Sequence, residues 1–443
     1  MSLRHFLTKL SEHGEIASVS TAVNCHLELA ALCRREFAKP NGGQALLFKQ
    51  ITNSTIPVTA NLFGSEKRIS LMLNSASLTD FQLKVEKFLG LLKGSSTYRL
   101  QQLETKNELV SSRLKTFSPY DLESLPAVRS WPQETGRYLT LALATTSHPH
   151  NGESNLGLYR AQIVSDNSLA VNFAPGSGAA EHLDAARACG QTMPISLALG
   201  ADPGLIWAAA APLPSGCDEY AFFRTLVNPE LSLTAGDSQD LAVPADAEIV
   251  LEGEIRPGKT VMEGPFGNHS GQYVSRKDCP LMHVTAVRLR DNPVMPITVV
   301  GPPPSENIYL AKANEILITE MLKIDFPQIS DIYMPQETFF HTVAIMTVKP
   351  QTTGQVRDLI YALWQDSPLQ RSRLLLLLDE DIDLRLPTRC WWRTINRLHC
   401  ERIFQDNGRI AIDATGVDPT TLVTEDQKTQ ALLQRRREEY NLF

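Results

Sequence analysis

Tyr138-Leu-Thr-Leu-Ala-Leu-Ala144 is the first of a series of short apolar runs that decide the fold class of this chain. Clusters of Gly, Pro, Asn and Asp separate the runs, and long helical periodicity is largely absent between about Phe117 and Pro304. Many short strands with turn residues between them predict a β-barrel or a β-sandwich. The later runs are Leu158–Val164, Leu169–Phe173, Ile195–Leu199, Ala247–Ile255, Met282–Leu289 and Met295–Val300.

Both flanks of this central region mix helix and strand signals. We therefore divide the chain into an N-terminal α/β region (1–115), a central β region (116–304) and a C-terminal α/β domain (305–443). The expected N-terminal elements are a helix capped by Ser2 and stopped by Gly14, strands over Ile16–Val23 and Gln44–Ile51, and helices over Leu27–Ala38 and Thr79–Lys93. The expected C-terminal elements are helices over Ile308–Ile324 and Val356–Trp364, strands over Thr342–Val348 and Leu374–Leu378, and a terminal helix over Lys428–Tyr440 after the capping-box pattern Thr424–Gln427.

Length and composition place the chain among globular proteins of more than one domain. It has 443 residues, 43% hydrophobic and 21% charged, and a formal net charge of −7. A chain this long exceeds the roughly 250–300 residues at which single hydrophobic cores stop growing, so two or three domains are expected. The mildly acidic balance gives no electrostatic reason to expect nucleic acid as a partner.

Targeting signals and cysteine usage favour the cytoplasm. The segment Met1–Leu10 has no apolar signal core, and no run approaches the roughly 20 apolar residues of a membrane-spanning helix. The 7 cysteines include no CxxC pair, which favours reduced thiols over a disulfide framework or a thiolate metal site. We therefore expect a cytoplasmic protein without a transmembrane segment.

The first candidate for chemistry is Asn155-Leu-Gly-Leu-Tyr-Arg160. Side chains alternate along a strand, so Asn155 and Arg160 are expected on opposite faces unless the chain bends near Gly157. An inward-facing arginine needs an anionic partner such as a carboxylate or a phosphate, because an unpaired buried charge is costly. Spacing alone also accommodates an arginine on the surface, so both alternatives stay open.

The second candidate is Glu263-Gly-Pro-Phe-Gly-Asn268-His269-Ser-Gly271. Its glycines and proline predict a tight loop rather than a regular element. Such a loop can present Glu263, Asn268 and His269 towards one point, and a carboxylate near Arg160 can stay ionised or share a proton with a substrate acid. An ordinary connection between strands, with solvated polar residues, is the alternative.

Three other patterns give weaker signals. Pro175-Gly-Ser-Gly178 resembles a phosphate-binding loop but lacks the full dinucleotide fingerprint, so a plain turn is favoured. His148-Pro-His150 lacks a third metal ligand, so a solvated loop is favoured. Trp391-Trp392 is expected to pack a helix rather than to stack on a ligand.

At these residues the sequence resembles the UbiD family, the prenylated-flavin-dependent reversible decarboxylases of aromatic and unsaturated acids. The resemblance extends over effectively the whole chain, in the family's order and approximate spacing. It rests on Ala45-Leu-Leu-Phe48, Ala60-Asn-Leu-Phe-Gly64, Asn155–Arg160, Ala198-Leu-Gly-Ala-Asp-Pro203, Asp218-Glu-Tyr-Ala-Phe222, Val243-Pro-Ala245, Glu248-Ile-Val-Leu-Glu-Gly253, Glu263–Gly267 and Gly301-Pro-Pro-Pro-Ser-Glu306.

The resemblance implies a split β-barrel of the flavin-reductase type between two α/β regions, with prenylated FMN as cofactor. It further implies a divalent metal (typically manganese) and potassium at the cofactor phosphate, a flavin prenyltransferase as supplier of the cofactor, and a homo-oligomer, either a dimer or a hexamer. Asn155 and Glu219 match metal ligands. The matching cofactor-binding positions are Leu158, Tyr159, Arg160, Asn172, Phe173, Ala174, Ser177 and Gly178.

The family's catalytic trio of Glu, Arg and Glu or Asp is matched only in part. Arg160 and Glu263 match two members, and the resemblance implies that the arginine positions the substrate carboxylate. The third member, a proton-donating acid, falls at Asn268, and an amide has no proton to donate near pH 7. Gly176 stands at about the place of a metal-binding histidine of many relatives. His182 either compensates for this loss or is an ordinary histidine on a helix surface.

Three hypotheses follow from the partial match. The first is a UbiD-like decarboxylase that takes the proton from Glu263, His269 or a bound water. The second is a non-catalytic homologue that acts as a subunit or a binding protein. The third is a flavin protein that binds or isomerises an acid without net loss of carbon dioxide. The substrate is left open within the class of aromatic and α,β-unsaturated acids.

Overall fold

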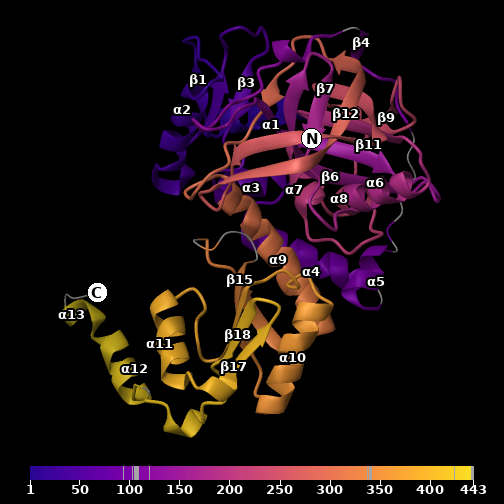
Figure 1. Ribbon diagram of the computed structural model, residues 1–443. Coiled ribbons are helices and arrows are strands. Elements are labelled where there is room, and N and C mark those ends of the chain that lie inside the picture. Colours follow the sequence, from indigo (N-terminus) through magenta and orange to yellow (C-terminus); the bar gives the residue numbers. More distant parts are fainter. Residues whose placement is uncertain are drawn as a thin grey trace. The chain divides into compact units, whose positions relative to one another are not determined.

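The computed structural model describes residues 1–92, 94–101, 103, 109–118, 120–336, 338, 342–423 and 425–440 (Figure 1). The chain divides into two compact units, one made of Met1–Pro327 with Met334–Thr342 and the other of Gln328–Tyr333 with Val343–Phe443. The divisions expected at 115/116 and 304/305 stay predictions.

The first unit begins with helices around a small sheet. Ser2 caps the first helix by accepting a hydrogen bond from the backbone N–H of His5 at 3.2 Å, as the sequence predicts. The sheet has the strand order β1-β2-β3-β13, so Met295–Pro296 joins the N-terminal strands rather than the central ones. The elements are α1 (Leu3–Glu12), β1 (Ile16–Val19), α2 (Glu28–Phe37), β2 (Ala45–Phe48), β3 (Val58–Ala60), α3 (Glu66–Met72), α4 (Leu78–Leu91), α5 (Ser96–Gln101) and β13 (Met295–Pro296). The last residue of the helix expected over Thr79–Lys93 lies outside the described residues.

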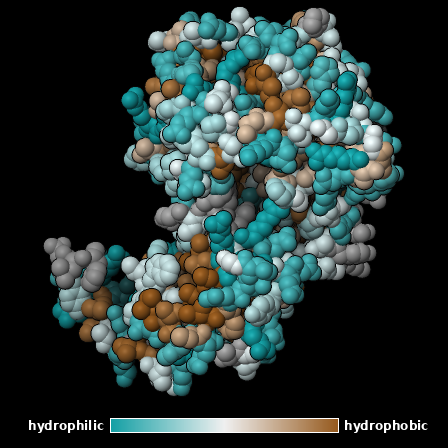
Figure 2. All heavy atoms as spheres, viewed as in Figure 1, coloured by the Kyte–Doolittle hydropathy of each residue, from teal (hydrophilic) through white to brown (hydrophobic). Residues whose placement is uncertain are grey.

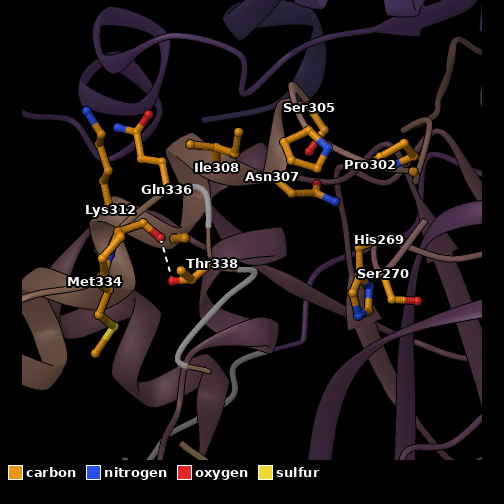
Figure 3. A pocket seen from close by; sticks show the side chains of 14 residues that line it. His269, Ser270, Pro302, Ser305, Asn307, Ile308, Lys312, Met334, Gln336 and Thr338 are labelled. Carbon is orange, nitrogen blue, oxygen red and sulfur yellow. Dashed lines mark hydrogen bonds between the residues drawn. The ribbon is translucent and has the colours of Figure 1, made fainter. Parts of the chain in front are cut away.

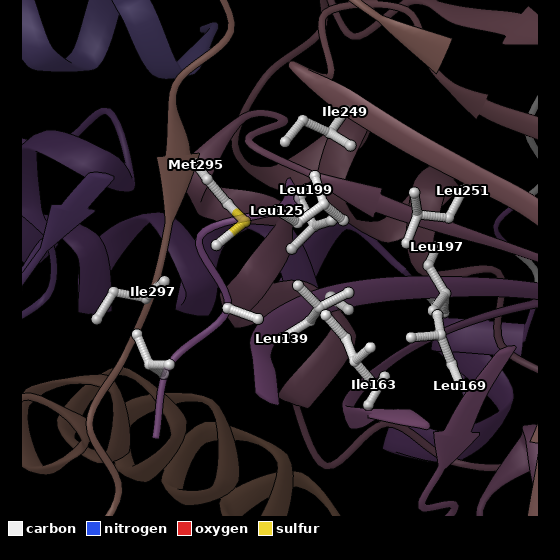
Figure 4. Close-up of a cluster of buried hydrophobic side chains, with 14 of the residues drawn as sticks. Leu125, Leu139, Ile163, Leu169, Leu197, Leu199, Ile249, Leu251, Met295 and Ile297 are labelled. Carbon is white, nitrogen blue, oxygen red and sulfur yellow. The ribbon is translucent and has the colours of Figure 1, made fainter. Parts of the chain in front are cut away.

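A second sheet of the first unit closes on itself. Its order is β11-β8-β5-β6-β7-β12-β4, and a further pairing of β11 with β12 makes a ring of six strands. Apolar side chains from neighbouring strands meet in one buried cluster, which Figure 4 shows around Leu139, Leu197 and Leu251. The strands are β4 (Lys115–Phe117), β5 (Tyr138–Ser147), β6 (Ser154–Ser165), β7 (Ser168–Val171), β8 (Met193–Leu199), β11 (Ile249–Gly267) and β12 (Tyr273–Leu289). Six of the seven expected strands are confirmed here, whereas the run Met295–Val300 gives only the short β13 of the other sheet. The flavin-reductase type of the ring stays a prediction.

Three short helices interrupt this all-β region, which sequence periodicity missed. They are α6 (Gly178–Ala188), α7 (Pro203–Ala210) and α8 (Glu219–Leu226), and a small hairpin, β9 (Leu233–Ala235) with β10 (Ala242–Pro244), follows them. Residues 203–208 of α7 are all buried, so this helix lacks the polar face on which periodicity depends. Asp202 and Asp218 cap α7 and α8 through backbone N–H groups.

The second unit is a five-stranded sheet with flanking helices, in the strand order β14-β15-β16-β18-β17. Its elements are β14 (Ile329–Tyr333), β15 (Val343–Val348), α10 (Thr353–Gln365), β16 (Leu374–Asp379), α11 (Pro387–Arg397), β17 (Ile403–Asp406), β18 (Arg409–Asp413), α12 (Gln427–Arg435) and α13 (Arg437–Tyr440). The expected leucine strand is therefore confirmed as β16. The single terminal helix expected over Lys428–Tyr440 is divided at Arg436. Asp426 caps α12, and the predicted cap Thr424 lies outside the described residues.

The helix α11 exposes apolar side chains on its surface. Trp391, Trp392 and Ile395 are each more than half exposed, so the prediction that the two tryptophans pack a helix is wrong. Figure 2 shows other apolar residues on the visible face of the same unit. Between α1 and α13, no described helix is both long and apolar enough to cross a membrane.

Candidate functional site

The site is built around an ion pair between Arg160 on β6 and Glu263 on β11. The Arg160 Nε and Nη2 atoms donate to the two Glu263 carboxylate oxygens at 2.8 and 2.9 Å, and Asn172 Nδ2 donates to Oε2 at 2.9 Å. The Glu263 side chain is fully buried, whereas Arg160 is 22% exposed. The guanidinium also lies 4.4 Å from the centre of the Phe266 ring. The alternative of an unpaired surface arginine is therefore wrong.

Neighbouring polar groups hold this pair in place. Gln162 Oε1 accepts from the backbone N–H of Gly264 at 2.9 Å and from the Tyr138 hydroxyl at 3.2 Å. Burial, with a smaller contribution from the charge of Glu263, raises the pKa of Tyr138, so its hydroxyl stays a neutral donor. Arg276 donates to the backbone carbonyl of Phe173 at 2.7 Å and brings a second cation close to the pair.

The segment that follows Glu263 differs from the predicted tight loop. The strand β11 continues to Gly267, and its register with β12 shifts between Glu263 and Phe266, as at a β-bulge. A turn begins only at Asn268, whose backbone N–H donates to Gln272 O at 2.9 Å. Turn-forming residue types inside a bulged strand explain the error, because glycine and proline are also frequent at bulges.

The structure separates the polar side chains that this loop was expected to bring together. Asn268 Oδ1 accepts from the backbone N–H of the next residue, His269, at 2.7 Å. The carboxylate of Glu263 is taken up by Arg160 and Asn172, whereas His269 lines a cavity of about 280 Å³. Burial and, to a smaller extent, the charge of Arg160 lower the pKa of His269 to about 4. Its imidazole is therefore neutral near pH 7.

The cavity lies within the first unit, between the turn at His269, the segment 301–305, the start of α9 (Asn307–Asp325) and residues 334–336 and 338 (Figure 3). Its lining is mostly apolar or neutral, and Figure 3 shows the His269 ring on one side of it. The described lining residues are His269, Ser270, Gly301, Pro302, Pro303, Ser305, Asn307, Ile308, Ala311, Lys312, Met334, Pro335, Gln336 and Thr338.

Two residues near the cavity, Glu134 and Trp131, were not predicted from the sequence. The buried Glu134 accepts backbone N–H bonds from Ser130, Trp131 and Gly267 at 2.6 to 3.1 Å. Trp131 Nε1 donates to Val300 O at 2.7 Å, and a Cβ at Gly267 would meet the Trp131 ring at 2.1 Å. An acidic residue after Trp-Pro signals a local turn, but nothing local in the sequence points to a contact with Gly267.

The predicted metal and phosphate residues form a second polar group. The pairing of β6 with β5 is uninterrupted from Ser154 to Tyr159, so Asn155 and Arg160 lie on opposite faces of β6, as alternation predicts. Asn155 instead contacts the start of α6, where a Cβ at Gly178 would meet its Oδ1 atom at 2.0 Å. Asn155 Nδ2 and Ser177 Oγ are buried without a hydrogen-bond partner among the described atoms.

This second group sits at the N-terminus of a helix. Ser177 is the N-cap of α6, and its side chain makes no capping hydrogen bond. The free N–H groups and the dipole at such an end favour an anion. The plain turn favoured for this segment is confirmed at Pro175 and Gly176, where the backbone N–H of Ser177 donates to Ala174 O at 3.1 Å, and the turn leads into the start of α6 at Gly178.

Glu219 lies beside the second group at the first residue of α8. Its Oε2 atom accepts from the backbone N–H of Leu156, the neighbour of Asn155, at 2.9 Å. Burial raises the pKa of Glu219 to about 7. Whether Asn155 and Glu219 bind a metal stays a prediction, as do the cofactor contacts expected of Leu158, Tyr159 and Ala174.

The segment 172–178 connects the two polar groups. Asn172 contacts Glu263 at one end, and Gly178 lies against the Asn155 side chain at the other. In between, the rings of Phe173 and Tyr159 lie 4.9 Å apart. This short segment thus links the ion pair of Arg160 and Glu263 to the polar group around Asn155.

His182 is not on a helix surface, as one alternative expected. It is 6% exposed, and its Nδ1 atom lies 2.9 Å from Thr146 Oγ1. Burial, followed by the charge of His148, lowers the pKa of His182 to about 4. No group of three or more His, Cys, Asp or Glu within the described part of the chain is arranged to hold a metal ion.

Comparisons with known proteins assign the family. Domain profiles of 3-octaprenyl-4-hydroxybenzoate carboxy-lyase match the chain over residues 7–87 (N-terminal domain), 101–303 (Rift-related domain) and 308–421 (C-terminal domain). The chain belongs to the UbiD family. An uncharacterized protein of Archaeoglobus fulgidus is 32% identical over 404 residues, which cover 89% of this chain and 84% of that one.

Solved structures share the fold of this UbiD-family chain. Vanillic acid decarboxylase of Sedimentibacter hydroxybenzoicus, in a closed form, has a TM-score of 0.88 at 22% identity and covers 99% of this chain and 98% of its own. An evolved dimeric form of the UbiD-class enzyme HmfF of Pelotomaculum thermopropionicum, in complex with prenylated FMN, has a TM-score of 0.82 at 23% identity, with 97% and 98% covered.

Proposed function

We propose that this chain is a prenylated-FMN-dependent decarboxylase of an aromatic or α,β-unsaturated carboxylic acid. The observation that carries the proposal is the bidentate pair of Arg160 and Glu263, in which the arginine keeps 22% of its side chain exposed. A planar guanidinium suits a carboxylate ligand. The family membership and the similar fold of vanillic acid decarboxylase support the same reaction class.

In this proposal Arg160 binds the substrate carboxylate with its exposed part, while Glu263 and Asn172 keep its orientation fixed. The mostly apolar cavity next to His269 receives the apolar body of the acid, because such a lining excludes water from the reacting carbon. Bound prenylated FMN supplies the electron sink for the electron pair that carbon dioxide leaves behind.

The second polar group fits the phosphate of this cofactor. The orphaned Asn155 Nδ2 and Ser177 Oγ atoms and the N-terminus of α6 supply donors for phosphate oxygens. Asn155 and Glu219 supply oxygen atoms, the ligand type that manganese and magnesium prefer. Phosphate oxygens would supply further ligands beside these two, and manganese and potassium stay predictions.

Co-expression with a flavin prenyltransferase tests the proposal. The purified chain should retain prenylated FMN, visible in its absorption spectrum and by its mass, whereas expression without the prenyltransferase should leave it out. An aromatic or α,β-unsaturated acid should then lose carbon dioxide. A chain that never retains prenylated FMN would refute the proposal. The expected homo-oligomer, dimer or hexamer, is a separate expectation.

A second candidate function is a non-catalytic subunit or binding protein. The observation in its favour is that Asn268 carries no titratable proton and uses Oδ1 within its own turn. The variant Asn268→Asp separates the two functions. If the cofactor-loaded parent shows no decarboxylation and the variant gains it, the parent is the non-catalytic form or performs other chemistry on the acid.

A further inference from the structure

A decarboxylase must protonate the carbon that carbon dioxide leaves, so its cavity needs a source of protons. Among the described residues that line this cavity, only His269 and Lys312 carry titratable side chains. Glu263 does not line the cavity, and Arg160 and Asn172 occupy both of its carboxylate oxygens.

Lys312 is engaged away from the reacting centre. Its ammonium group forms an ion pair with Glu66 and lies 5.7 Å from the centre of the Tyr309 ring. Figure 3 shows its nitrogen directed away from His269. This ion pair and this orientation keep the ammonium away from His269 and its side of the cavity.

Asn268 is excluded by chemistry and by position. Its amide has no proton to transfer near pH 7, and its oxygen closes the turn on the N–H of His269. The same hydrogen bond fixes the backbone from which the His269 ring reaches the wall of the cavity. His269, which follows Asn268 in the turn, is therefore the residue of this turn that carries an ionisable side chain at the cavity.

We propose that His269 is the proton donor of the reaction and that it takes up its proton from solvent when the substrate carboxylate binds. The inference rests on the proposed function. After the bond between the carboxyl group and the adjacent carbon breaks, carbon dioxide leaves and the electron pair stays with the substrate. The N–H bond of the imidazolium then breaks, its proton forms the new C–H bond, and neutral imidazole remains.

Electrostatics supports the coupling between binding and proton uptake. Without a substrate, burial and the cation Arg160 on β6 lower the pKa of His269 to about 4, whereas Lys312 on α9 is paired with Glu66 and is directed away from the imidazole. A carboxylate bound to Arg160 brings a negative charge next to the imidazole. This charge favours the imidazolium and raises the pKa of His269. Proton uptake thus accompanies binding.

Calorimetry on the cofactor-loaded chain measures this uptake without any turnover. The probe is 3-phenylpropanoate, a saturated aromatic carboxylate, titrated at pH 7 in two buffers with different ionisation enthalpies. We expect uptake of up to one proton per bound carboxylate, and a loss of up to tenfold in affinity per unit of increasing pH between pH 6 and 8. In His269→Gln the uptake should vanish and the affinity should become independent of pH.

Lys312→Gln is the matched control from the same lining, and its proton uptake should equal that of the parent. Equal uptake in His269→Gln, or no uptake in the parent, would overturn the inference while carboxylate binding leaves the proposed function intact. Failure of the parent to bind the carboxylate at all would overturn both. His269→Gln should also lose product formation while it retains the cofactor, and unchanged product formation in this variant would overturn the inference.

Discussion

Replacing Glu263 with glutamine tests how strongly the ion pair anchors β6 to β11. The carboxylate accepts three hydrogen bonds, two from Arg160 and one from Asn172, whereas the amide offers a single acceptor oxygen and turns an NH₂ group towards these donors. Hydrogen bonds to charged groups contribute about 1.5–3 kcal/mol each. Water reaches the 22% exposed Arg160 and offsets part of the loss, so we expect about 2 kcal/mol.

Hydrogen exchange followed by mass spectrometry measures this local loss. A cost of about 2 kcal/mol makes exchange in peptides from β6 and β11 roughly 30-fold faster. Glu254→Gln is the matched control on the same strand: its partner Arg256 is 61% exposed, and such surface pairs contribute about 0.5 kcal/mol, or roughly twofold. Equal acceleration in the two variants would refute the reasoning that burial makes the pair strong.

Three further outcomes are expected. Gly178→Ala should lower the flavin content at least tenfold because the new Cβ displaces Asn155, whereas Gly90→Ala, in open space on α4, should not; absorbance of purified protein checks both. Burial lowers the pKa of His182 to about 4 in the folded chain, below its usual 6.5, so folding favours the neutral imidazole. The stability that this preference contributes is present above pH 6.5 and is lost as the pH falls from 6.5 to 4. In urea unfolding, the free energy of unfolding of His182→Gln should therefore fall less than that of the parent over this pH range. Ile395→Ser on the exposed face of α11 should weaken self-association about tenfold in sedimentation velocity, and an unchanged distribution would place the interface elsewhere.

The strands of the ring could be predicted because each is a short apolar run with turn residues at its ends. The pairing of Arg160 with Glu263 could not, since 103 residues separate them and spacing along one strand says nothing about the strand that lies beside it. From the residues alone the sequence indicated that a buried arginine needs an anion, and it was the family resemblance that put Arg160 and Glu263 in one catalytic trio. Periodicity failed for α7 because a helix buried on all sides has no polar face.

The candidate site was predicted unevenly for the same reason. Asn155 and Arg160 fall on opposite faces as alternation requires, because β6 is regular over that stretch. Glu134 went unnoticed, because its role depends on Gly267, which lies 133 residues further along the chain. For His182 the sequence left a compensating metal ligand and a helix-surface histidine open, because a helical position alone does not report burial.

The packing of Trp131 has a consequence for how this protein can change in evolution. Its ring fills the space that side chains at Gly267 and Gly301 would need, with Cβ approaches of 2.1 and 2.4 Å. Neither glycine can accept a larger residue while the tryptophan is present, and a smaller residue at 131 would leave a void and lose the hydrogen bond to Val300. We therefore expect the residues at positions 131, 267 and 301 to change together in evolution or not to change at all.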